Sequence, residues 1–425
     1  MATRVEARQG TSVNDYDYSS FFYSSSDDPF AILDPYAEWF TRAVPTGYYL
    51  FQQPMSTPPG SRIDVTEGLH HEHIRLLNLA SYNYLGLSNR PEVIEAARAA
   101  LDQYGLGAAG SPLLSGMMDI HVQLEEALAR FNRKEAAMVF PTGYSTNVGL
   151  ISGLMRPGDW IIADQNAHAS IVDGAILSKA NVRFFRHNNP ADLERKLKQA
   201  TGKKLVAIEG VYSMDGDVCP LPELVEVAKR YGARIMLDEA HSAFVYGDNG
   251  RGVAEMYDLE DEVDIHVGTF SKALGGQGGY VAGSRKLYDY LRGFARARVF
   301  SCALAPAVTA GVLKSLELAQ QEPELRERLW SNVRHIRRRL DEEGVDVGDS
   351  TSQVIPVMVR NDRRIFELGH KLLRAGLYLQ PVIYPAVAKH RSRFRVSISA
   401  SHTCEQLDEG VSILVRVLRE EGVMV

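Results

Sequence analysis

The amino-acid sequence predicts an α/β protein built on a large, mostly parallel β-sheet, followed by a smaller α+β domain at the C-terminus. From about residue 91, short apolar runs of strand length alternate with helical patterns, which is typical of a parallel sheet covered by helices on both faces. A polar cluster follows each apolar run, and from about residue 305 the chain becomes strongly helical and charged. These three observations define the expected architecture.

The N-terminal part of the chain has no period long enough to predict a helix or a strand. Residues 11–36 are rich in Ser, Asp and Tyr, and residues 54–62 are rich in Pro and Gly. We therefore expect an extension that packs on a partner subunit or stays mobile. The predicted organisation is an N-terminal extension and arm over 1–95, a large α/β domain over 96–305 and a small C-terminal domain over 306–425.

The regular elements can be predicted in order along the chain. Apolar residues at helical spacing predict helices over 91–105 and 120–132. Short apolar runs predict strands over 136–140, 160–164, 204–209, 234–238 and 263–268, and a further strand begins near residue 278. The C-terminal domain is expected to contain a strand within 394–402 and a last helix after it.

Composition argues against several classes of function. The net charge is −6 and both signs are mixed along the chain, so no basic stripe for nucleic acid is present. No apolar run reaches the roughly 18 residues of a membrane span, and the N-terminus lacks the apolar core of a signal peptide. The three cysteines show no ligand or disulfide spacing. We expect a cytoplasmic protein of enzyme size with free thiols and no metal.

Polar clusters at the strand ends predict the position of a ligand site, because ligands bind at the carboxyl ends of parallel strands. Each of the five clusters directly follows or closes one predicted strand. They comprise residues 142–144, 164–168, 209–213, 238–241 and 269–272.

The stretch "GTFSKALGGQGGY", residues 268–280, places a lysine before a run of glycines. A phosphate-binding P-loop has the glycines before the lysine, and a dinucleotide loop needs GxGxxG between a strand and a helix. Neither order is present. The alternatives are that Lys272 is a reactive group projecting from the strand end, or that it is a solvated loop lysine.

Asp238 closes a very apolar predicted strand, so its carboxylate needs a cationic partner. The partner could be a metal shared with Glu239 and His241, a buried arginine, or the protonated pyridine nitrogen of pyridoxal phosphate. The last alternative also explains Lys272, because the cofactor aldehyde needs an amine for its Schiff base. His241 could then reach the ring hydroxyl.

Two further features fit a phosphorylated, flat cofactor but are weak alone. Gly143 and Tyr144 open a predicted helix after a strand, where backbone N–H groups attract a phosphate. A plain strand-to-helix turn would look the same. His168 lies at another strand end, where its imidazole could stack on a heteroaromatic ring or serve structure only.

Together these residues resemble the α-oxoamine synthase family of fold type I pyridoxal-phosphate enzymes, which includes 8-amino-7-oxononanoate synthase, 2-amino-3-ketobutyrate CoA ligase, 5-aminolevulinate synthase and serine palmitoyltransferase. The resemblance runs from about Leu77 to the C-terminus. It is carried by eight stretches in the family's order: "LASYNYLGL", "GAAGSPLLSGMMDIHVQLEEALARF", "NAHAS", "EGVYSMDGD", "LDEAHS", "GTFSKALGGQGGY", "FSCALAP" and "RFRVSISASHT".

The resemblance implies a role for each matching residue. Lys272 would hold pyridoxal phosphate as a Schiff base and move protons at the substrate Cα, Asp238 would pair with the pyridinium nitrogen, and His168 would stack on the ring. The remaining implied contacts are Ser213 and His241 at the phenolic oxygen; Gly143, Tyr144 and Thr269 at the phosphate, with Ser301 and Cys302 of the other subunit of a homodimer; and Asn83 and Arg395 at the substrate carboxylate. Arg393 is expected to be structural.

The implied reaction is a decarboxylative condensation of an amino acid with an acyl thioester, which releases an α-amino ketone, carbon dioxide and a free thiol. Differences from well-known members, such as "SPLLSG" in place of "TRNISG", argue against aminolevulinate synthesis. They favour a long-chain donor or one bound to an acyl carrier protein. The rival interpretations are another fold type I activity, such as an aminotransferase or a lyase, and a non-catalytic paralogue subunit. The presence of Lys272, Asp238 and His168 argues against the latter.

Overall fold

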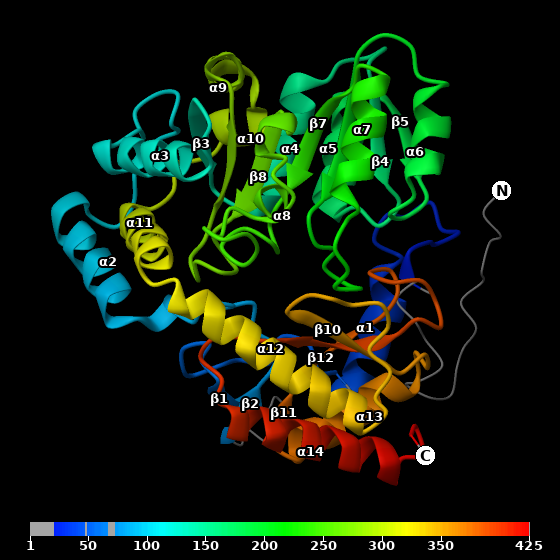
Figure 1. Ribbon diagram of the computed structural model, residues 1–425. Coiled ribbons are helices and arrows are strands. Elements are labelled where there is room, and N and C mark those ends of the chain that lie inside the picture. The colour runs from blue at the N-terminus through cyan, green and yellow to red at the C-terminus, as the bar shows by residue number, and fades with distance from the viewer. Residues whose placement is uncertain (1–20, 47–48, 67–72, 425) are drawn as a thin grey trace. The chain divides into compact units, whose positions relative to one another are not determined.

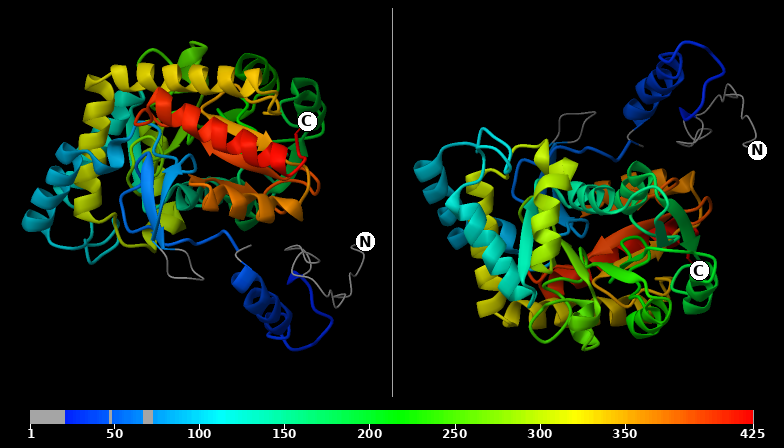
Figure 2. Two further views of the ribbon diagram at one scale, coloured as in Figure 1. Left: turned by 90° about the horizontal axis from the view of Figure 1, so that it is seen from below. Right: turned by 90° about the horizontal axis from the view of Figure 1, so that it is seen from above.

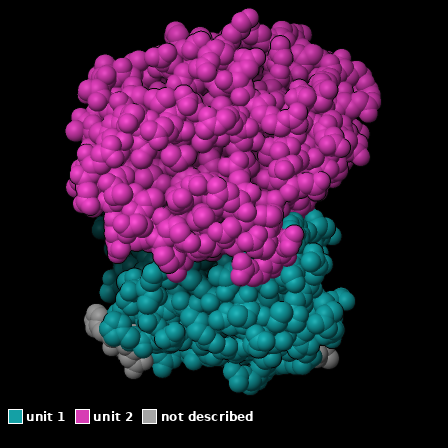
Figure 3. All heavy atoms as spheres, turned by 60° about the vertical axis from the view of Figure 1, so that its left-hand side comes forward, with its two compact units in different colours: residues 1–81, 214–216, 330–425 teal, residues 82–213, 217–329 magenta. Residues whose placement is uncertain are grey.

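The structure is a computed structural model that describes residues 21–46, 49–66 and 73–424 (Figure 1). The chain forms two compact units (Figure 3). Unit 1 contains 1–81, 214–216 and 330–425, and unit 2 contains 82–213 and 217–329. Within the described ranges, no helix is long and apolar enough to cross a membrane. The three-part division expected from the sequence remains a prediction, since contact grouping alone does not define folding domains.

Unit 2 is built on a seven-stranded sheet in the order β3-β9-β8-β7-β6-β4-β5. Its strands are β3 (Ala136–Phe140), β4 (Trp160–Asp164), β5 (Asn181–Phe185), β6 (Lys204–Glu209), β7 (Arg234–Asp238), β8 (Ile265–Thr269) and β9 (Gly279–Gly283). Neighbours pair in parallel from β8 to β5, whereas β9 runs antiparallel to both β3 and β8. The predicted large, mostly parallel sheet is confirmed.

The sequence analysis did not predict β5, one strand of this sheet. The edge strand β5 has the sequence "NVRFF", and only Phe185 in it is buried. An edge strand has neighbours on one side only, so it carries neither a continuous apolar run nor a clean alternation. The strands further inside the sheet, such as β6, are apolar almost throughout.

Helices cover the sheet of unit 2 (Figures 1 and 2). The helices α4, α5 and α9 contribute Leu150, Ile171 and Leu291 to one core cluster with strand residues such as Met236. The helices of unit 2 are α2 (Pro91–Tyr104), α3 (Asp119–Phe131), α4 (Gly143–Leu154), α5 (Ala169–Ser178), α6 (Pro190–Leu197), α7 (Leu221–Arg230), α8 (Val253–Met256), α9 (Arg285–Phe294), α10 (Arg296–Val299) and α11 (Pro306–Gln321).

In its described residues, unit 1 combines two three-stranded sheets with four α-helices. One sheet has the order β1-β2-β11 and the other β10-β13-β12. The strands are β1 (Arg62–Thr66), β2 (His73–Asn78), β10 (Val354–Met358), β11 (Leu377–Tyr378), β12 (Gln380–Val382) and β13 (Arg393–Ser397). The helices are α1 (Leu33–Ala43), α12 (Glu324–Glu342), which starts in unit 2, α13 (Arg364–Arg374) and α14 (Cys404–Glu420). The expected mixture of strands and helices in the C-terminal part is confirmed.

Two features of unit 1 bear on the expectations. Helix α1 begins inside the stretch for which no regular structure was expected, and its Tyr36 and Trp39 rings contact Phe21. Residues 11–20 of that stretch lie outside the described residues. Helices α12 and α14 lie side by side (Figure 2). Asp408 of α14 accepts hydrogen bonds from His335 and Arg339 of α12.

Candidate active site

Lys272 follows β8 in a short loop of unit 2 and keeps part of its surface exposed. Burial lowers the pKa of its ammonium below the usual 10.5, although the carboxylates of Asp238 and Glu209 oppose the shift. Along the described parts of the chain, no hydrogen bond or ion pair joins the Lys272 amine to another residue. The amine is therefore available to react with a carbonyl carbon.

Asp238 is the last residue of β7 and is only 5% exposed. One carboxylate oxygen accepts a hydrogen bond of 2.7 Å from the Asn147 amide, and the other accepts one of 2.9 Å from the backbone N–H of Ala240. Both donors are neutral. The carboxylate is thus oriented but not neutralised by them, and it suits a cationic nitrogen of a ligand.

A chain of hydrogen bonds joins Asp238 to His168. The Asn147 amide also donates to the Ser170 hydroxyl at 2.9 Å, and this hydroxyl lies 2.7 Å from Nδ1 of His168. The backbone N–H of His168 donates to buried Glu209 at 2.5 Å. Burial lowers the pKa of His168, against the pull of the Asp238 carboxylate. The hydrogen bonds therefore hold the ring in place, and the lowered pKa favours its neutral form.

His241 follows β7 closely and is buried, with its Nδ1 2.8 Å from the Tyr84 hydroxyl. Burial, together with the neighbouring Lys272 and His168 side chains, lowers its pKa well below 6.5. Ser213 lies in the loop after β6 and is half-buried.

The N-terminus of α4 forms a narrow cradle. Thr142 caps this helix by accepting the Ser145 N–H at 2.9 Å, whereas the first N–H groups of a helix, here those of Gly143 and Tyr144, have no partner inside it. A Cβ added to Gly143 would lie 2.8 Å from Oγ1 of Thr269, the last residue of β8. Only glycine fits there, and the site combines a helix N-terminus with a hydroxyl, as a phosphate needs.

The predicted carboxylate-binding residues fall in different units. In unit 1, Arg395 of β13 is 7% exposed, its Nη1 lies 3.9 Å from the Met214 sulfur, and burial lowers its pKa to about 10. In unit 2, the Asn83 amide donates to Ser88 at 2.8 Å. Arg393, which was expected to be structural, is fully buried and pairs with Asp215 at 2.5 Å within unit 1.

Ser301 follows α10 and is half-buried, and Cys302 beside it is exposed. Their neighbour Phe300 is 74% exposed, which is unusual for a large apolar side chain. These residues therefore lie on a surface of unit 2 that a partner could cover.

The metal alternative for Asp238 finds no support in the arrangement of its neighbours. Glu239 is turned away toward α8, where it accepts the backbone N–H groups of Val253 and Ala254 at 2.9 and 3.0 Å. Over the ranges that the structure describes, no group of three His, Cys, Asp or Glu side chains could hold a metal ion.

Sequence reasoning assigned no individual role to four residues of this site: Asn147, Ser170, Glu209 and Tyr84. Of these, Glu209 opens the predicted polar cluster 209–213. Asn147 could have been found, because it lies four residues after Gly143 and hence on the same face of α4. Ser170 follows His168 by two residues in "NAHAS". Glu209 and Tyr84 carry no local signal that points to their distant partners.

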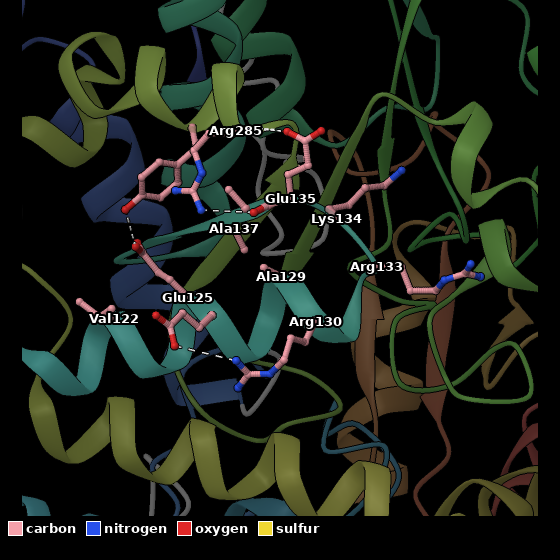
Figure 4. Close-up of a pocket in the computed structure, with 12 residues that line it drawn as sticks. Val122, Glu125, Ala129, Arg130, Arg133, Lys134, Glu135, Ala137 and Arg285 are labelled. Carbon is pink, nitrogen blue, oxygen red and sulfur yellow. Dashed lines mark hydrogen bonds and ion pairs between the residues drawn. The ribbon is translucent and has the colours of Figure 1, made fainter.

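A pocket of about 360 Å³ lies elsewhere in unit 2, between α3, β3 and the start of α9. Figure 4 shows some of its polar groups in pairs: Tyr288 donates to Glu125, and the Arg285 backbone donates to Glu135. Glu125 also pairs with Arg298, which does not line the pocket. None of the predicted site residues lines it, so it is not the site described above.

Comparison with known proteins supports the cofactor that these residues suggest. The family model "Aminotransferase class I and II" matches residues 74–414. The chain is 40% identical to a serine palmitoyltransferase of Sphingobacterium spiritivorum over 376 residues, which are 88% of this chain and 93% of that protein. It is also 40% identical to an 8-amino-7-oxononanoate synthase of Alkaliphilus metalliredigens over 367 residues, 84% of this chain and 93% of that protein.

Solved structures show the same relationship. A serine palmitoyltransferase of Sphingomonas wittichii superposes with a TM-score of 0.89 at 35% identity, covering 94% of this chain and all of the other. An 8-amino-7-oxononanoate synthase of Francisella tularensis gives 0.71 at 26% identity, with 82% and 99% covered. Among the structures that match at 0.89 is a serine palmitoyltransferase with pyridoxal phosphate attached as its internal aldimine.

The residues present fit this cofactor, because a buried carboxylate, a helix N-terminus that only glycine can line and a lysine of lowered pKa occur together in unit 2. The fold and the comparisons agree with that chemistry: the chain is a fold type I pyridoxal-phosphate enzyme and belongs to the α-oxoamine synthase family.

Proposed function

We propose that the protein condenses an amino acid with an acyl thioester, with loss of carbon dioxide, at a site centred on Lys272. The observation that carries the proposal is the Asp238 carboxylate, which is buried, oriented by Asn147 and Ala240, and left without a cationic partner among the donors that orient it. Bound pyridoxal phosphate supplies an electron sink at the substrate Cα, and it needs an acid partner for its ring nitrogen.

The residues of this chain perform the remaining tasks. Asp238 would keep the ring nitrogen protonated. His168 and His241, whose pKa values are both lowered by burial, would pack against the ring and hydrogen-bond its oxygen. Gly143, Tyr144, Thr269 and Ser213 complete the cofactor contacts. The Lys272 amine, with its lowered pKa, removes a proton from the substrate Cα and later returns one to the product.

Arg395 and Asn83 bind the amino-acid carboxylate in this proposal. The guanidinium of Arg395 is buried, and its planar fork suits bidentate binding of a carboxylate. Such a contact holds the group that leaves as carbon dioxide without bonding to it covalently.

Serine and a long-chain acyl thioester are the substrates that we propose first. The support is the activity by which the serine palmitoyltransferases are named, because their structures match this chain with TM-scores of up to 0.89, against 0.71 for the 8-amino-7-oxononanoate synthase. The donor is acyl-CoA or an acylated carrier protein. The second candidate is the synthesis of an oxononanoate-type amino ketone, favoured by the 40% identity to such a synthase.

A homodimer with shared active sites is part of the proposal. Leu106, Leu114 and Phe300 are 86%, 83% and 74% exposed in unit 2, and apolar side chains this open favour a protein partner. Ser301, next to Phe300, would reach the phosphate of the partner's site. The cytoplasmic location expected from the composition also belongs to the proposal.

The substrates are tested by a spectral titration of the cofactor-loaded protein with serine, alanine and glycine, each followed by palmitoyl-CoA or a carrier-bound acyl chain. We expect a thiol-releasing reaction with serine and a long-chain donor. Turnover with alanine and a shorter donor supports the second candidate, and amino-group transfer to a keto acid without thiol release contradicts both.

The dimer is tested by sedimentation and by mixing. We expect Leu114→Arg to shift the protein to a monomer with weakened cofactor binding. A mixture of Lys272→Ala and Ser301→Arg proteins, each inactive alone, should regain activity through mixed dimers if the sites are shared. A monomeric wild-type protein with full activity would contradict this part of the proposal.

A further inference from the structure

His187 lies in the loop after β5, between two carboxylates from other segments of unit 2. Its Nδ1 is 2.9 Å from Oδ1 of Asp164, and its Nε2 is 2.7 Å from Oδ2 of Asp217. Asp164 is fully buried and Asp217 is partly buried. Because each ring nitrogen faces a carboxylate acceptor, both must carry a hydrogen, and the imidazole is cationic.

The surroundings of His187 favour this charge. Burial alone would lower its pKa, but the hydrogen bonds to Asp164 and Asp217 outweigh burial and raise it to about 10. The other groups that face the ring are Tyr212, whose ring meets it edge-on at 4.5 Å between centroids, and Asn188, whose amide donates to Asp217 at 2.6 Å. The adjacent Arg186 is turned to Asp192 instead.

Asp164 begins the loop that presents His168. Its carboxylate accepts the backbone N–H groups of Asn166 and Asn188, both at 2.8 Å, and its carbonyl accepts that of Ala167 at 3.0 Å. These bonds fix the two residues immediately before His168. The buried carboxylate thus connects the loop after β4 with the loop after β5.

Asp217 closes the loop that presents Ser213. Its carbonyl accepts the Tyr212 N–H at 3.0 Å, and a bridge between Val211 and Val218 completes the turn. Ser213 therefore projects from a turn whose base is fastened to His187. The imidazole is the link between this turn and the carboxylate that anchors the His168 loop.

We propose that His187 is a positioning residue, whose imidazolium bridges Asp164 and Asp217 and thereby holds the His168 and Ser213 loops in the arrangement that binds the cofactor. The proposal rests on the proposed function, because those two loops matter only if His168 and Ser213 contact pyridoxal phosphate. Nothing in the contacts of His187 places it in touch with the reacting atoms, so its action is indirect.

The test compares wild type with His187→Gln, which removes the charge, and with His335→Gln as a matched control. His335 is a half-buried histidine 3.0 Å from Asp408 in unit 1. The first readout is the pyridoxal phosphate dissociation constant, measured by fluorescence from pH 6.5 to pH 10. We expect His187→Gln to raise it about tenfold at neutral pH, the effect of one lost buried hydrogen bond, and His335→Gln to leave it unchanged.

The pH dependence separates a charged bridge from simple packing. The folded-state pKa of about 10 lies above the usual 6.5, so the stabilisation is complete below pH 6.5 and disappears as the pH rises through 10. The difference in urea unfolding between wild-type and His187→Gln apoprotein should shrink over the same interval. The ratio of their cofactor dissociation constants should shrink with it.

The outcomes distinguish the two proposals. A folded His187→Gln protein with wild-type cofactor affinity, or a stability difference that does not change with pH, overturns the role of His187. A wild-type protein that binds no pyridoxal phosphate overturns the proposed function, whatever the apoprotein titration shows. If His187→Gln does not fold, Asp217→Asn is measured in its place. We expect this variant to lose less affinity for pyridoxal phosphate than the tenfold expected for His187→Gln, and the loss should still depend on pH. Unchanged affinity in Asp217→Asn overturns the proposal.

Discussion

Asn147→Ala is the change that tests the buried network of the site most sharply. Asn147 is 2% exposed and donates to the Asp238 carboxylate at 2.7 Å and to the Ser170 hydroxyl at 2.9 Å. A hydrogen bond to a charged group contributes about 1.5–3 kcal/mol and a neutral one about 0.5–1.5 kcal/mol. We therefore expect the apoprotein to lose about 2–4 kcal/mol of unfolding free energy, measured in urea.

Saturating pyridoxal phosphate should reduce this loss, because the ring nitrogen restores a partner to the Asp238 carboxylate. We expect the penalty to fall by about 1 kcal/mol or more. Asn332→Ala is the matched control, since the Asn332 amide is equally buried and donates to the carbonyls of Ser399 and His402 at 3.0 and 2.9 Å within unit 1. A cofactor effect of the same size in both variants, or in neither, would refute the reasoning.

Three further changes follow from the same geometry. Gly143→Ala should weaken cofactor binding at least tenfold, because its Cβ would lie 2.8 Å from Thr269 Oγ1, whereas Gly293→Ala, which meets no atom within 4 Å, should leave the dissociation constant unchanged. Glu239→Gln should flatten the dependence of the unfolding free energy on pH between pH 4.5 and 7. Burial raises the Glu239 pKa to about 7, so the wild-type fold is about 3 kcal/mol more stable below pH 4.5, where Glu239 is protonated, than above pH 7. An unchanged urea-unfolding profile in the variant contradicts that shift. Arg395→Lys should raise the KM for the amino acid about tenfold with a smaller change in kcat, since lysine lacks the bidentate fork; an unchanged KM removes Arg395 from the carboxylate site.

The central part of the site could be predicted because the chemistry lies at strand ends. Lys272, Asp238 and His168 each follow or close a strand that is recognisable from its apolar residues. In a parallel sheet those ends share one edge, so position along the chain translates into proximity. The charge of Asp238 then restricted the cofactor, because a buried carboxylate needs a cation.

The rest depends on contacts that local sequence does not encode. His187 is one of 12 histidines, and only the pairing of β4 with β5, which sets Asp164 opposite Phe185, brings it to its first carboxylate. The edge strand β5 was missed because its apolar residues form neither a continuous run nor a clean alternation. Helix α1 was missed because its aromatic residues pack in a local cluster. Side-chain networks such as that of Asn147 appear only once distant segments are brought together.

The covalent bond between Lys272 and the cofactor is the central claim and can be measured directly. The protein is loaded with pyridoxal phosphate, reduced with borohydride, digested and analysed by mass spectrometry. We predict one modified peptide that carries a phosphopyridoxyl group on Lys272 and no modification in Lys272→Ala. A label on a different lysine, or an unlabelled protein that still condenses an amino acid with an acyl thioester, would contradict the account.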